Sequence, residues 1–148
     1  MSQSSVSAPA LTKEDYELLA EFRYTLRKFL GFSEVAASEH GLTPHQYQAL
    51  LAIQGHPGRA RVSIGELAER MQVAHHSAVG LVDRMEKLGL VRRAVAKEDR
   101  RRVEVGLTPK GLRILEKLYR VHRDELRAVG PRLIGLLKQA ADQPTTQG

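Results

Sequence analysis

The stretch AHHSAVGLVDRMEKLG followed by LVRRAVAKEDRRR, residues 74–102, decides the fold expected for this chain. In its first half, apolar residues recur at helical spacing and predict a helix with one apolar face: Ala78, Leu81, Val82, Met85 and Leu88. Gly89 supplies a left-handed stop. Two short β-prone runs follow, at 90–95 and 103–107, joined by an arginine-rich tip. A short helix beside a basic hairpin fits two adjacent grooves of DNA.

The positive charge of the chain is concentrated around this stretch. Residues 84–113 hold ten Lys or Arg and four acidic residues, a net charge of +6. The whole chain, with 23 basic and 17 acidic residues, also has a net charge of +6, so the remainder is neutral. A localised basic patch is typical of proteins that bind nucleic acid, although many such runs only keep a surface soluble.

Length and composition bound the other possibilities. A chain of 148 residues, 42% hydrophobic and 27% charged, is expected to form one globular domain. No apolar run is long enough to cross a membrane, and the first ten residues do not resemble a secretory signal. Cysteine is absent, which excludes disulfides and thiol chemistry and suits a cytoplasmic location.

Capping boxes predict where three helices begin. In such a box, Ser or Thr caps the helix and a side chain three residues later returns the hydrogen bond. The chain has three of them: Thr12 with Asp15, Thr43 with Gln46, and Ser63 with Glu66. Each precedes a segment whose apolar residues recur every three or four positions, so we expect a helix after each box.

The first of these helices is long and the next two are short. The first is expected to run to about Glu39 and to end at Gly41. The second is expected to end at 55–58, before a brief strand at 59–62. The third leads through a tight turn into the helix at 75–88, and two short helices joined in this way form the helix-turn-helix pattern.

A second long helix is expected after the hairpin. Thr108 and Pro109 cap it, and the Gly130-Pro131 pair is expected to break or kink it before it resumes to about residue 141. Both long helices carry apolar stripes, and one subunit of this size cannot easily hide both from water. We therefore interpret the stripes as the interface of a homodimer.

The sequence resembles the MarR family of winged helix-turn-helix transcriptional regulators over roughly residues 12–140. Three segments carry the resemblance: SIGELAERMQV (63–73), LVDRMEKLGLVRR (81–93) and EDRRRVEVGLTPKG (98–111), the last matching the family's Asp-Arg-Arg wing followed by Leu-Thr-Pro-Lys-Gly. The resemblance implies six helices and a β-wing in a two-fold dimer. Helices one, five and six would dimerise, helices three and four would form the helix-turn-helix, and the wing would reach the minor groove.

The resemblance places the recognition helix and its contacts. His75, His76 and Ser77 fall at its start, where side chains meet base edges in the major groove. Asp83 and Arg84 are expected to brace the helix against the wing or to touch phosphate. The family commonly has a Ser cap and a Pro at this start, where this chain has Ala74 and His75, so its base preferences are expected to differ.

The resemblance also implies the roles of the wing residues. In the wing's Asp-x-Arg pattern, Asp99 would orient the guanidinium of Arg101 for the minor groove. Arg100 and Arg102 are expected to contact phosphates, which position a protein without specifying sequence. Ser63, at the start of the third helix, completes the expected DNA-binding set.

Members of the family keep a small-molecule pocket between the dimer helices and the DNA-binding lobe. Tyr24, His40, His45 and Tyr47 are candidates for its lining, and their mixture of polar and apolar groups suits an aromatic carboxylate or a phenol. A different interpretation stays open, namely an architectural or interaction dimer that binds DNA and senses no ligand.

Metal binding and catalysis have weaker support in the sequence. His75 and His76 are adjacent, so they diverge by about 100° on a helix and cannot chelate together. Neither HExxH nor a Cys/His cluster is present, which leaves a metal-responsive regulator as a lesser alternative. The chain has no nucleophile elbow and no phosphate-binding glycine loop, so an enzyme is not expected, nor a cofactor.

The sequence therefore predicts a mainly α protein with a small β-hairpin wing. We expect one domain at 11–141, in which dimerisation helices at 11–41 and 109–141 flank a winged helix-turn-helix lobe at 43–108, with flexible tails at 1–10 and 142–148. The expected function is a sequence-specific transcriptional regulator, a repressor. It would bind double-stranded DNA at a palindromic operator as a homodimer and be released by a small aromatic or phenolic ligand.

Overall fold

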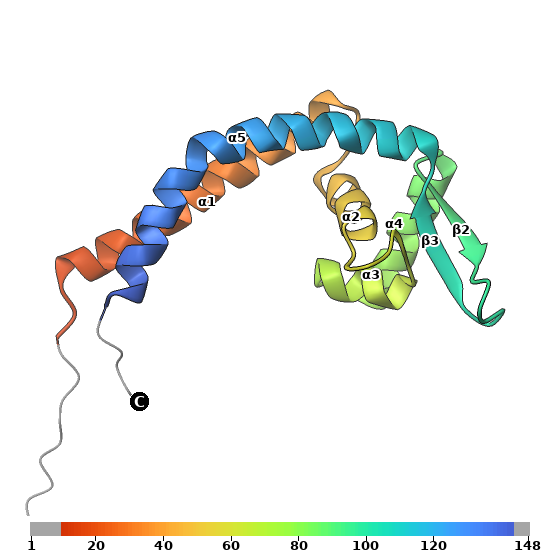
Figure 1. Cartoon of the computed structure of the whole chain (residues 1–148), viewed down its shortest axis with the longest axis horizontal. Helices are drawn as coiled ribbons and strands as arrows, with labels where there is room; N and C mark the ends of the chain where they lie inside the picture. The colour runs from red at the N-terminus through yellow and green to blue at the C-terminus, as the bar shows by residue number, and fades with distance from the viewer. Residues whose placement is uncertain (1–9, 144–148) are drawn as a thin grey trace, which may run out of the picture. The chain divides into compact units, whose positions relative to one another are not determined.

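The structure, a computed structural model, describes residues 10–143 (Figure 1). Five α-helices and three strands are found there, in the order α1 (Lys13–Glu39), α2 (Pro44–Gln54), β1 (Arg61–Val62), α3 (Ile64–Met71), α4 (His75–Lys87), β2 (Val91–Val95), β3 (Val103–Leu107) and α5 (Pro109–Ala141). The predicted mainly α fold with a small hairpin is confirmed. The predicted tails fall almost wholly at 1–9 and 144–148, outside the described residues.

The predicted helix boundaries follow from caps that the structure contains. All three capping boxes form, with Thr43 and Ser63 as N-caps of α2 and α3 and Thr12 hydrogen-bonded to Asp15 before α1. Gly41 and Gly89 follow α1 and α4 with φ of +78° and +73°, the left-handed conformation that glycine adopts without strain. Local chemistry therefore sets both ends of these helices.

The strands form one antiparallel sheet of order β1-β3-β2. The central strand β3 places Val105 opposite Val62 of β1 and Arg93 of β2. Val62 and Val105 are fully buried, so one face of the sheet packs on the helices. The expected brief strand at 59–62 is confirmed as β1, and it converts the hairpin into a three-stranded sheet.

The start of α5 is tied to the junction between α4 and β2. Thr108 Oγ1 donates to the carbonyl of Gly89 (2.5 Å) and accepts from the N–H of Gly111 (3.1 Å). A Cβ atom at Gly111 would lie 2.2 Å from the carbonyl oxygen of Leu90, so only glycine fits there. The Thr-Pro-Lys-Gly segment thus fixes the base of the hairpin against the end of α4.

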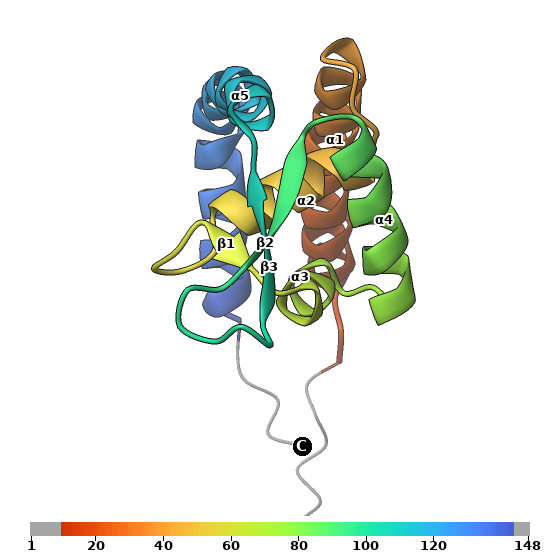
Figure 2. The ribbon, with the colours of Figure 1, turned by 90° about the vertical axis from the view of Figure 1, so that its right-hand side faces the viewer.

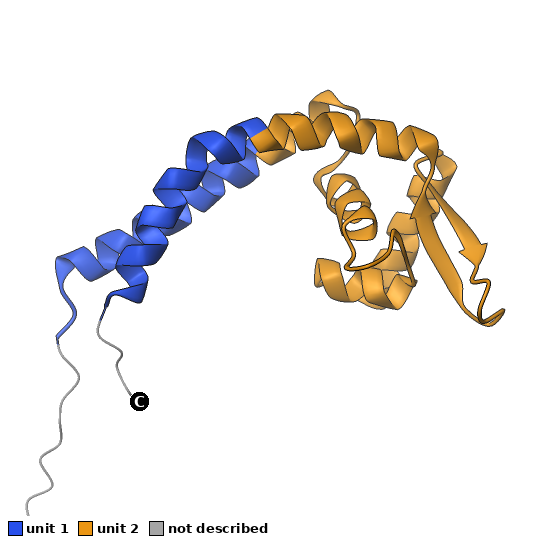
Figure 3. Ribbon diagram, in the orientation of Figure 1, with its two compact units in different colours: residues 1–32, 124–148 blue, residues 33–123 orange. Residues whose placement is uncertain are grey.

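The chain divides into two compact units (Figure 3), one formed by residues 1–32 and 124–148 and the other by residues 33–123. We call them unit 1 and unit 2. Unit 2 is larger than the predicted lobe at 43–108, because the end of α1 and the first half of α5 belong to it. Its core combines side chains from α1 to α5 and the sheet, among them Leu50, Ile53, Leu67, Val82, Met85 and Leu118.

The structure differs from two expectations about the helices. Of the break or kink expected at Gly130-Pro131, the break does not occur: α5 continues through Pro131, so the described residues contain five helices, where the resemblance implied six. A proline inside a helix costs about 3 kcal/mol, and packing within unit 1 offsets this cost, since Leu136 is buried and Arg132 pairs with Glu21 (3.0 Å). Leu88 is 49% exposed rather than part of the apolar face, because α4 ends before it.

Candidate nucleic-acid interface

The N-terminal turn of α4 and the tip of the hairpin lie at the same edge of unit 2. Figure 2, together with Figure 1, shows α4 and the hairpin on either side of α3, with the start of α4 and the loop between β2 and β3 directed the same way. The helix turns its apolar side inward, since Ala78, Leu81, Val82 and Met85 are buried. Its first residues, His75, His76 and Ser77, are exposed.

The start of α4 has no side-chain cap. Ala74 occupies the N-cap position and makes no capping hydrogen bond, because an alanine side chain has no acceptor atom. The first N–H groups of a helix have no partner within the helix, and they carry the positive end of its dipole. An uncapped helix start at an exposed edge is suited to bind an anionic oxygen such as a phosphate.

An arginine that sequence reasoning missed holds α4 against the wing. Arg93 of β2 donates to Asp83 (2.6 Å) and to Glu86 (3.0 Å), both on α4. The backbone N–H of Arg93 also donates to Glu86 and keeps the pKa of that carboxyl below its usual value. The expected brace from Asp83 is confirmed, whereas Arg84 is exposed and has no ion pair within residues 10–143.

The wing tip is a tight turn whose charged side chains point into solvent. Asp99, Arg100 and Arg101 are all exposed. The carboxylate of Asp99 accepts from the backbone N–H of Arg101 (3.0 Å), whereas the resemblance implied a contact with the Arg101 guanidinium. A short Asp side chain readily reaches the N–H two residues later, and this contact shapes the turn. The guanidinium of Arg101 has no ion pair in the described part of the chain.

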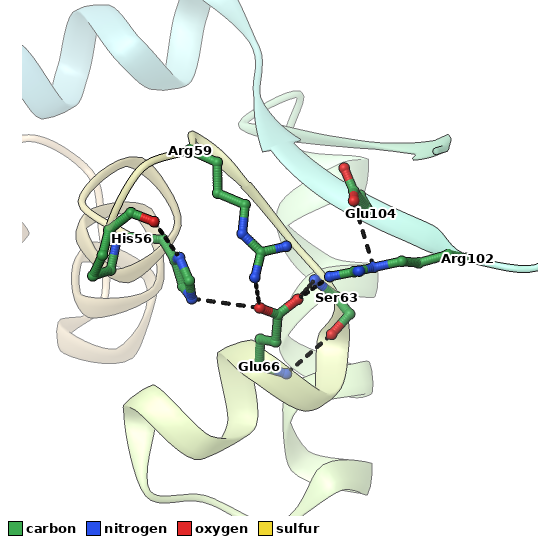
Figure 4. A network of polar contacts seen from close by, with 7 residues as sticks. His56, Arg59, Ser63, Glu66, Arg102 and Glu104 are labelled. Carbon is green, nitrogen blue, oxygen red and sulfur yellow. Dashed lines mark hydrogen bonds and ion pairs between the residues drawn. The ribbon is translucent and has the colours of Figure 1, made fainter. Parts of the chain in front are cut away.

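A second cluster, missed by the sequence reasoning, lies between the wing and α3 (Figure 4). Its centre is Glu66, whose carboxylate accepts from Arg59, from Arg102 (2.7 Å) and from the N–H of Ser63 (3.1 Å). His56 lies 3.4 Å from the same carboxylate. We call Glu66, Arg59 and Arg102 the Glu66 cluster.

The charge state of Glu66 follows from these contacts. Burial alone would raise the pKa of its carboxyl, but hydrogen bonds from Ser63 and Arg102 and the positive charge of Arg59 lower it from 4.5 to about 2. Glu66 is therefore ionised at neutral pH. Arg102, which the sequence predicts as a phosphate contact, is paired with Glu66 and, at 3.5 Å, with Glu104.

Ser63, also expected at the DNA, caps α3 in the structure. Its Oγ accepts from the N–H of Glu66 (3.2 Å), and the side chain of Glu66 returns the bond to the N–H of Ser63. The sequence could indicate this role, since the capping box is a local pattern. It could not indicate Arg102, which is brought to Glu66 by the pairing of β1 with β3, or Arg59, which reaches Glu66 from the loop before β1.

The four candidate pocket residues belong to two units and differ in burial. Tyr24 belongs to unit 1, is 55% exposed and has the Lys28 ammonium 5.3 Å from its ring centre. In unit 2, Tyr47 is buried and stacks on His122, with ring centres 4.8 Å apart. His40 contacts the carbonyl of Ala36 at 2.8 Å, and His45 is exposed. Tyr47 is thus a core residue.

Unit 2 contains a different cavity, of about 510 Å³, between α2 and α5. Leu51, Leu112 and Leu115 provide apolar walls, and Tyr119 and Arg120 add polar groups. Within residues 10–143, no group of three or more His, Asp or Glu side chains could hold a metal ion. In the same range, no helix is both long and apolar enough to span a bilayer.

Comparison with known proteins connects these features to one family. Residues 40–102 match the model of the MarR family. A protein of Thauera aromatica, described as a candidate transcriptional regulator for the hcr operon, is 30% identical over 125 residues, which cover 79% of this chain and 74% of that protein.

Solved structures have the same fold. A MarR family protein from Bacillus stearothermophilus has a TM-score of 0.71 at 25% identity, over 90% of this chain and all of that chain. The Staphylococcus aureus MepR–DNA complex has a TM-score of 0.59 at 21% identity, over 81% of this chain and 95% of that one. The likeness to MepR, at this identity, establishes the fold alone.

Proposed function

This chain belongs to the MarR family of transcriptional regulators, and from that membership we propose that it represses transcription by binding a palindromic operator as a homodimer. Membership makes it a regulator rather than an enzyme. One observation carries the proposal: the exposed start of α4 and the wing tip lie at one edge of unit 2. A recognition helix in the major groove would then bring the wing to the adjacent minor groove.

The arginines at the proposed interface fall into two groups, those available to contact DNA and those held by carboxylates of the protein. Arg84, Arg100 and Arg101 have no ion pair within the described residues, so their guanidinium groups are available to DNA. Arg59, Arg93 and Arg102 are neutralised by carboxylates of the protein. His75, His76 and Ser77 would read base edges, while the uncapped N–H groups of α4 would hold a phosphate.

Exposed apolar side chains of unit 1 support the homodimer. Among the described residues of unit 1, eight are at least 47% exposed: Leu11, Tyr16, Leu19, Tyr24, Leu30, Leu126, Ile134 and Leu137. A groove of about 430 Å³ runs among several of these residues. Exposed apolar surface on this scale is costly in water, and a second copy of the chain would cover it. A two-fold dimer presents two identical reading edges, which calls for a palindromic operator.

The cavity of unit 2 is our candidate for the effector site, in place of the four residues predicted from the sequence. Its leucine walls suit an aromatic ring, and the Arg120 guanidinium suits a carboxylate. An effector releases the operator only if it binds the free protein more tightly than the DNA-bound protein. Calorimetry with benzoate and phenol, with and without operator, tests this. Equal affinities for the free and the DNA-bound protein would favour a dimer that senses no ligand. In either case, we propose that the protein acts in the cytoplasm.

Selection of DNA fragments by the purified protein from a genomic pool tests the proposed function. We expect an inverted repeat to be enriched. The operator should reduce expression of a downstream reporter when the protein is present. A variant with His76→Ala and Ser77→Ala, both exposed, should fold and lose the enrichment. Enrichment of sequences without any inverted repeat would contradict the proposal, and an increase in reporter expression would contradict repression.

A further inference from the structure

The two strands of the wing are attached to different helices of unit 2. Strand β2 is joined to α4 through Arg93 and its two carboxylate partners. Where the wing loop enters β3, Arg102 is joined to Glu66 in the first turn of α3. Figure 4 shows the Arg102 side chain reaching from the wing toward Glu66, with Arg59 approaching the other oxygen of the same carboxylate.

Arg102 is poorly placed to act as a phosphate contact. Its Nη2 donates to Glu66 at 2.7 Å, and its Nε lies 3.5 Å from Glu104. Two of its three guanidinium nitrogens already face carboxylates, which neutralise its charge and weaken its attraction for a phosphate. Glu66 does not lose its charge at neutral pH, since its pKa is about 2. The neighbouring Arg101 has no such partner in the described residues and is free to move toward DNA.

Anchoring Arg102 constrains the residue beside it. Three hydrogen bonds close the wing turn. The N–H of Ala96 donates to the carbonyl of Arg102 (2.8 Å), and the N–H of Arg102 donates to the carbonyl of Asp99 (3.0 Å). The N–H of Arg101 donates to the Asp99 carboxylate. A turn closed on itself and fixed at one end has few conformations to lose on binding. Such preorganisation improves affinity without a new contact.

We propose that Glu66 is a positioning residue that, through Arg102, holds the wing at the spacing from α4 that operator binding requires. The inference rests on the proposed DNA-binding function. Glu66 itself would touch no DNA. Arg102 would act through Glu66 rather than through phosphate, which replaces the role that the sequence suggested for it. Arg59 is part of the same device, because it holds the second oxygen of the carboxylate.

Glu66→Gln gives a test in which the sign of the effect is decisive. Gln keeps the capping box of α3 and removes a negative charge close to the DNA-binding edge. A purely electrostatic role predicts tighter binding to DNA of any sequence. The positioning role predicts about fivefold weaker binding to the operator, the equivalent of ordering one more side chain on binding. The matched control is Glu69→Gln, an exposed carboxylate one turn later on α3, which should not weaken binding.

The partner variant and the double variant complete the test. Arg102→Gln should weaken operator binding about as much as Glu66→Gln does, and the double variant should be no weaker than either. The dependence of affinity on salt should be unchanged in all three. Tighter binding by Glu66→Gln would overturn the proposal. A phosphate contact at Arg102 would also overturn it. In that case Arg102→Gln would lose the same affinity for operator and for scrambled DNA, and the slope of log affinity against log salt concentration would fall in magnitude by about one.

Hydrogen exchange of the wing amides separates this proposal from the proposed function. The amides of Ala96, Arg101 and Arg102 should exchange faster in Glu66→Gln than in the wild type and in Glu69→Gln, whether or not DNA is bound. Unchanged exchange would contradict the positioning role even if the protein binds an operator. Failure of the wild type to bind any DNA, with faster exchange in the variant, would contradict only the proposed function.

Discussion

Three consecutive arginines in the wing differ in what surrounds them. Arg100 and Arg101 are exposed and have no ion pair in residues 10–143, whereas Arg102 is shared between two carboxylates. Identical side chains therefore carry different roles, because only the free guanidinium groups can exchange water for DNA without breaking an internal pair. At this scale the neighbours of a residue, more than its type, determine what it does.

Arg101→Ala should affect both the affinity and the sequence preference of DNA binding. A guanidinium inserted into the minor groove reads its width, so we expect a loss of about 1–3 kcal/mol and a weaker preference at the outer operator positions. Asp99→Ala should have a similar effect, because it opens the turn that presents Arg101. Binding assays with the operator and with scrambled DNA check this. Equal tightening on both DNAs in Asp99→Ala would mean that Asp99 acts only by charge repulsion.

Glu66→Gln should lower stability in a pH-dependent way. The pKa of Glu66 is about 2 in the folded protein against 4.5 for a free side chain, so its ionised form stabilises the fold. This stabilisation is complete above pH 4.5 and is lost as the pH falls through 2. We expect the variant to be about 1 kcal/mol less stable at pH 7. Urea unfolding of both proteins should show the difference shrinking below pH 4.5; a difference independent of pH would mean that charge is not its cause.

The positions of the site could be predicted from the sequence, but most of the pairings could not. The exposed start of the recognition helix and the charged tip follow from local patterns. The partners of Glu66 are seven and 36 residues away, and the more distant one, Arg102, meets it only through the β1–β3 register. Arg93 was likewise missed, although two acids three residues apart on α4 indicate a surface that awaits a basic partner.

At the scale of elements, caps determine most boundaries, and α4 is the exception. The other helix starts with identified N-caps have capping boxes, whereas α4 begins at Ala74 without a side-chain hydrogen bond. An uncapped helix start at the proposed DNA-binding edge lowers the stability of the helix, and its N–H groups would gain a hydrogen-bond partner when a phosphate binds there. Local stability and binding therefore compete at this position.

Ala74→Ser should separate stability from binding. A serine cap would satisfy one of the free N–H groups of α4 and stabilise the protein by about 1 kcal/mol. It would also compete with phosphate for that group, so affinity for the operator should not rise. Thermal unfolding and operator binding of the variant test the two parts. A variant that gained no stability would show that the start of α4 is already satisfied.

The continuity of α5 at Pro131 shows where element prediction from sequence stops. Gly-Pro is a local signal for a helix break or a kink, and here the helix continues, with Leu136 beyond it buried by packing within unit 1. In contrast, the Thr-Pro-Lys-Gly segment is recognisable in the sequence as a motif, whereas the reason for its glycine is seen only in the structure. Gly111 is required because the backbone of Leu90 lies against it, a contact between residues 21 positions apart in sequence.

At the scale of the whole molecule, the apolar residues of the long helices divide between core and surface. Leu115 and Leu118 are buried in unit 2, whereas Leu19, Ile134 and Leu137 of unit 1 are more than half exposed. The sequence predicted apolar stripes but not which residues a single chain would bury. The division into two units, with each long helix contributing to both, also depends on tertiary packing.

Ile134→Lys should shift the protein toward monomer. Ile134 is 55% exposed in the single chain, so the substitution should cost little within a subunit, but it would bury a charge in a dimer interface. Gln139→Lys adds the same charge to an exposed position of α5 and serves as the control. Sedimentation at micromolar concentration should find the wild type and the control as dimers. A wild type that sediments as a monomer of 16.5 kDa would contradict the dimer.

The proposed symmetric dimer would require a fixed spacing between the two half-sites of the operator. Two recognition helices related by a two-fold axis enter successive major grooves about 34–36 Å apart, on one face of the duplex. Inserting five base pairs between the half-sites turns one of them to the opposite face, whereas inserting ten restores the face.

Operator affinity as a function of half-site spacing is therefore the most direct measurement. We expect the five-base-pair insertion to weaken binding about a hundredfold, through loss of simultaneous engagement, and the ten-base-pair insertion to weaken it less. Equal affinity for all three DNAs would contradict a two-fold dimer that reads two half-sites with α4 and the wing.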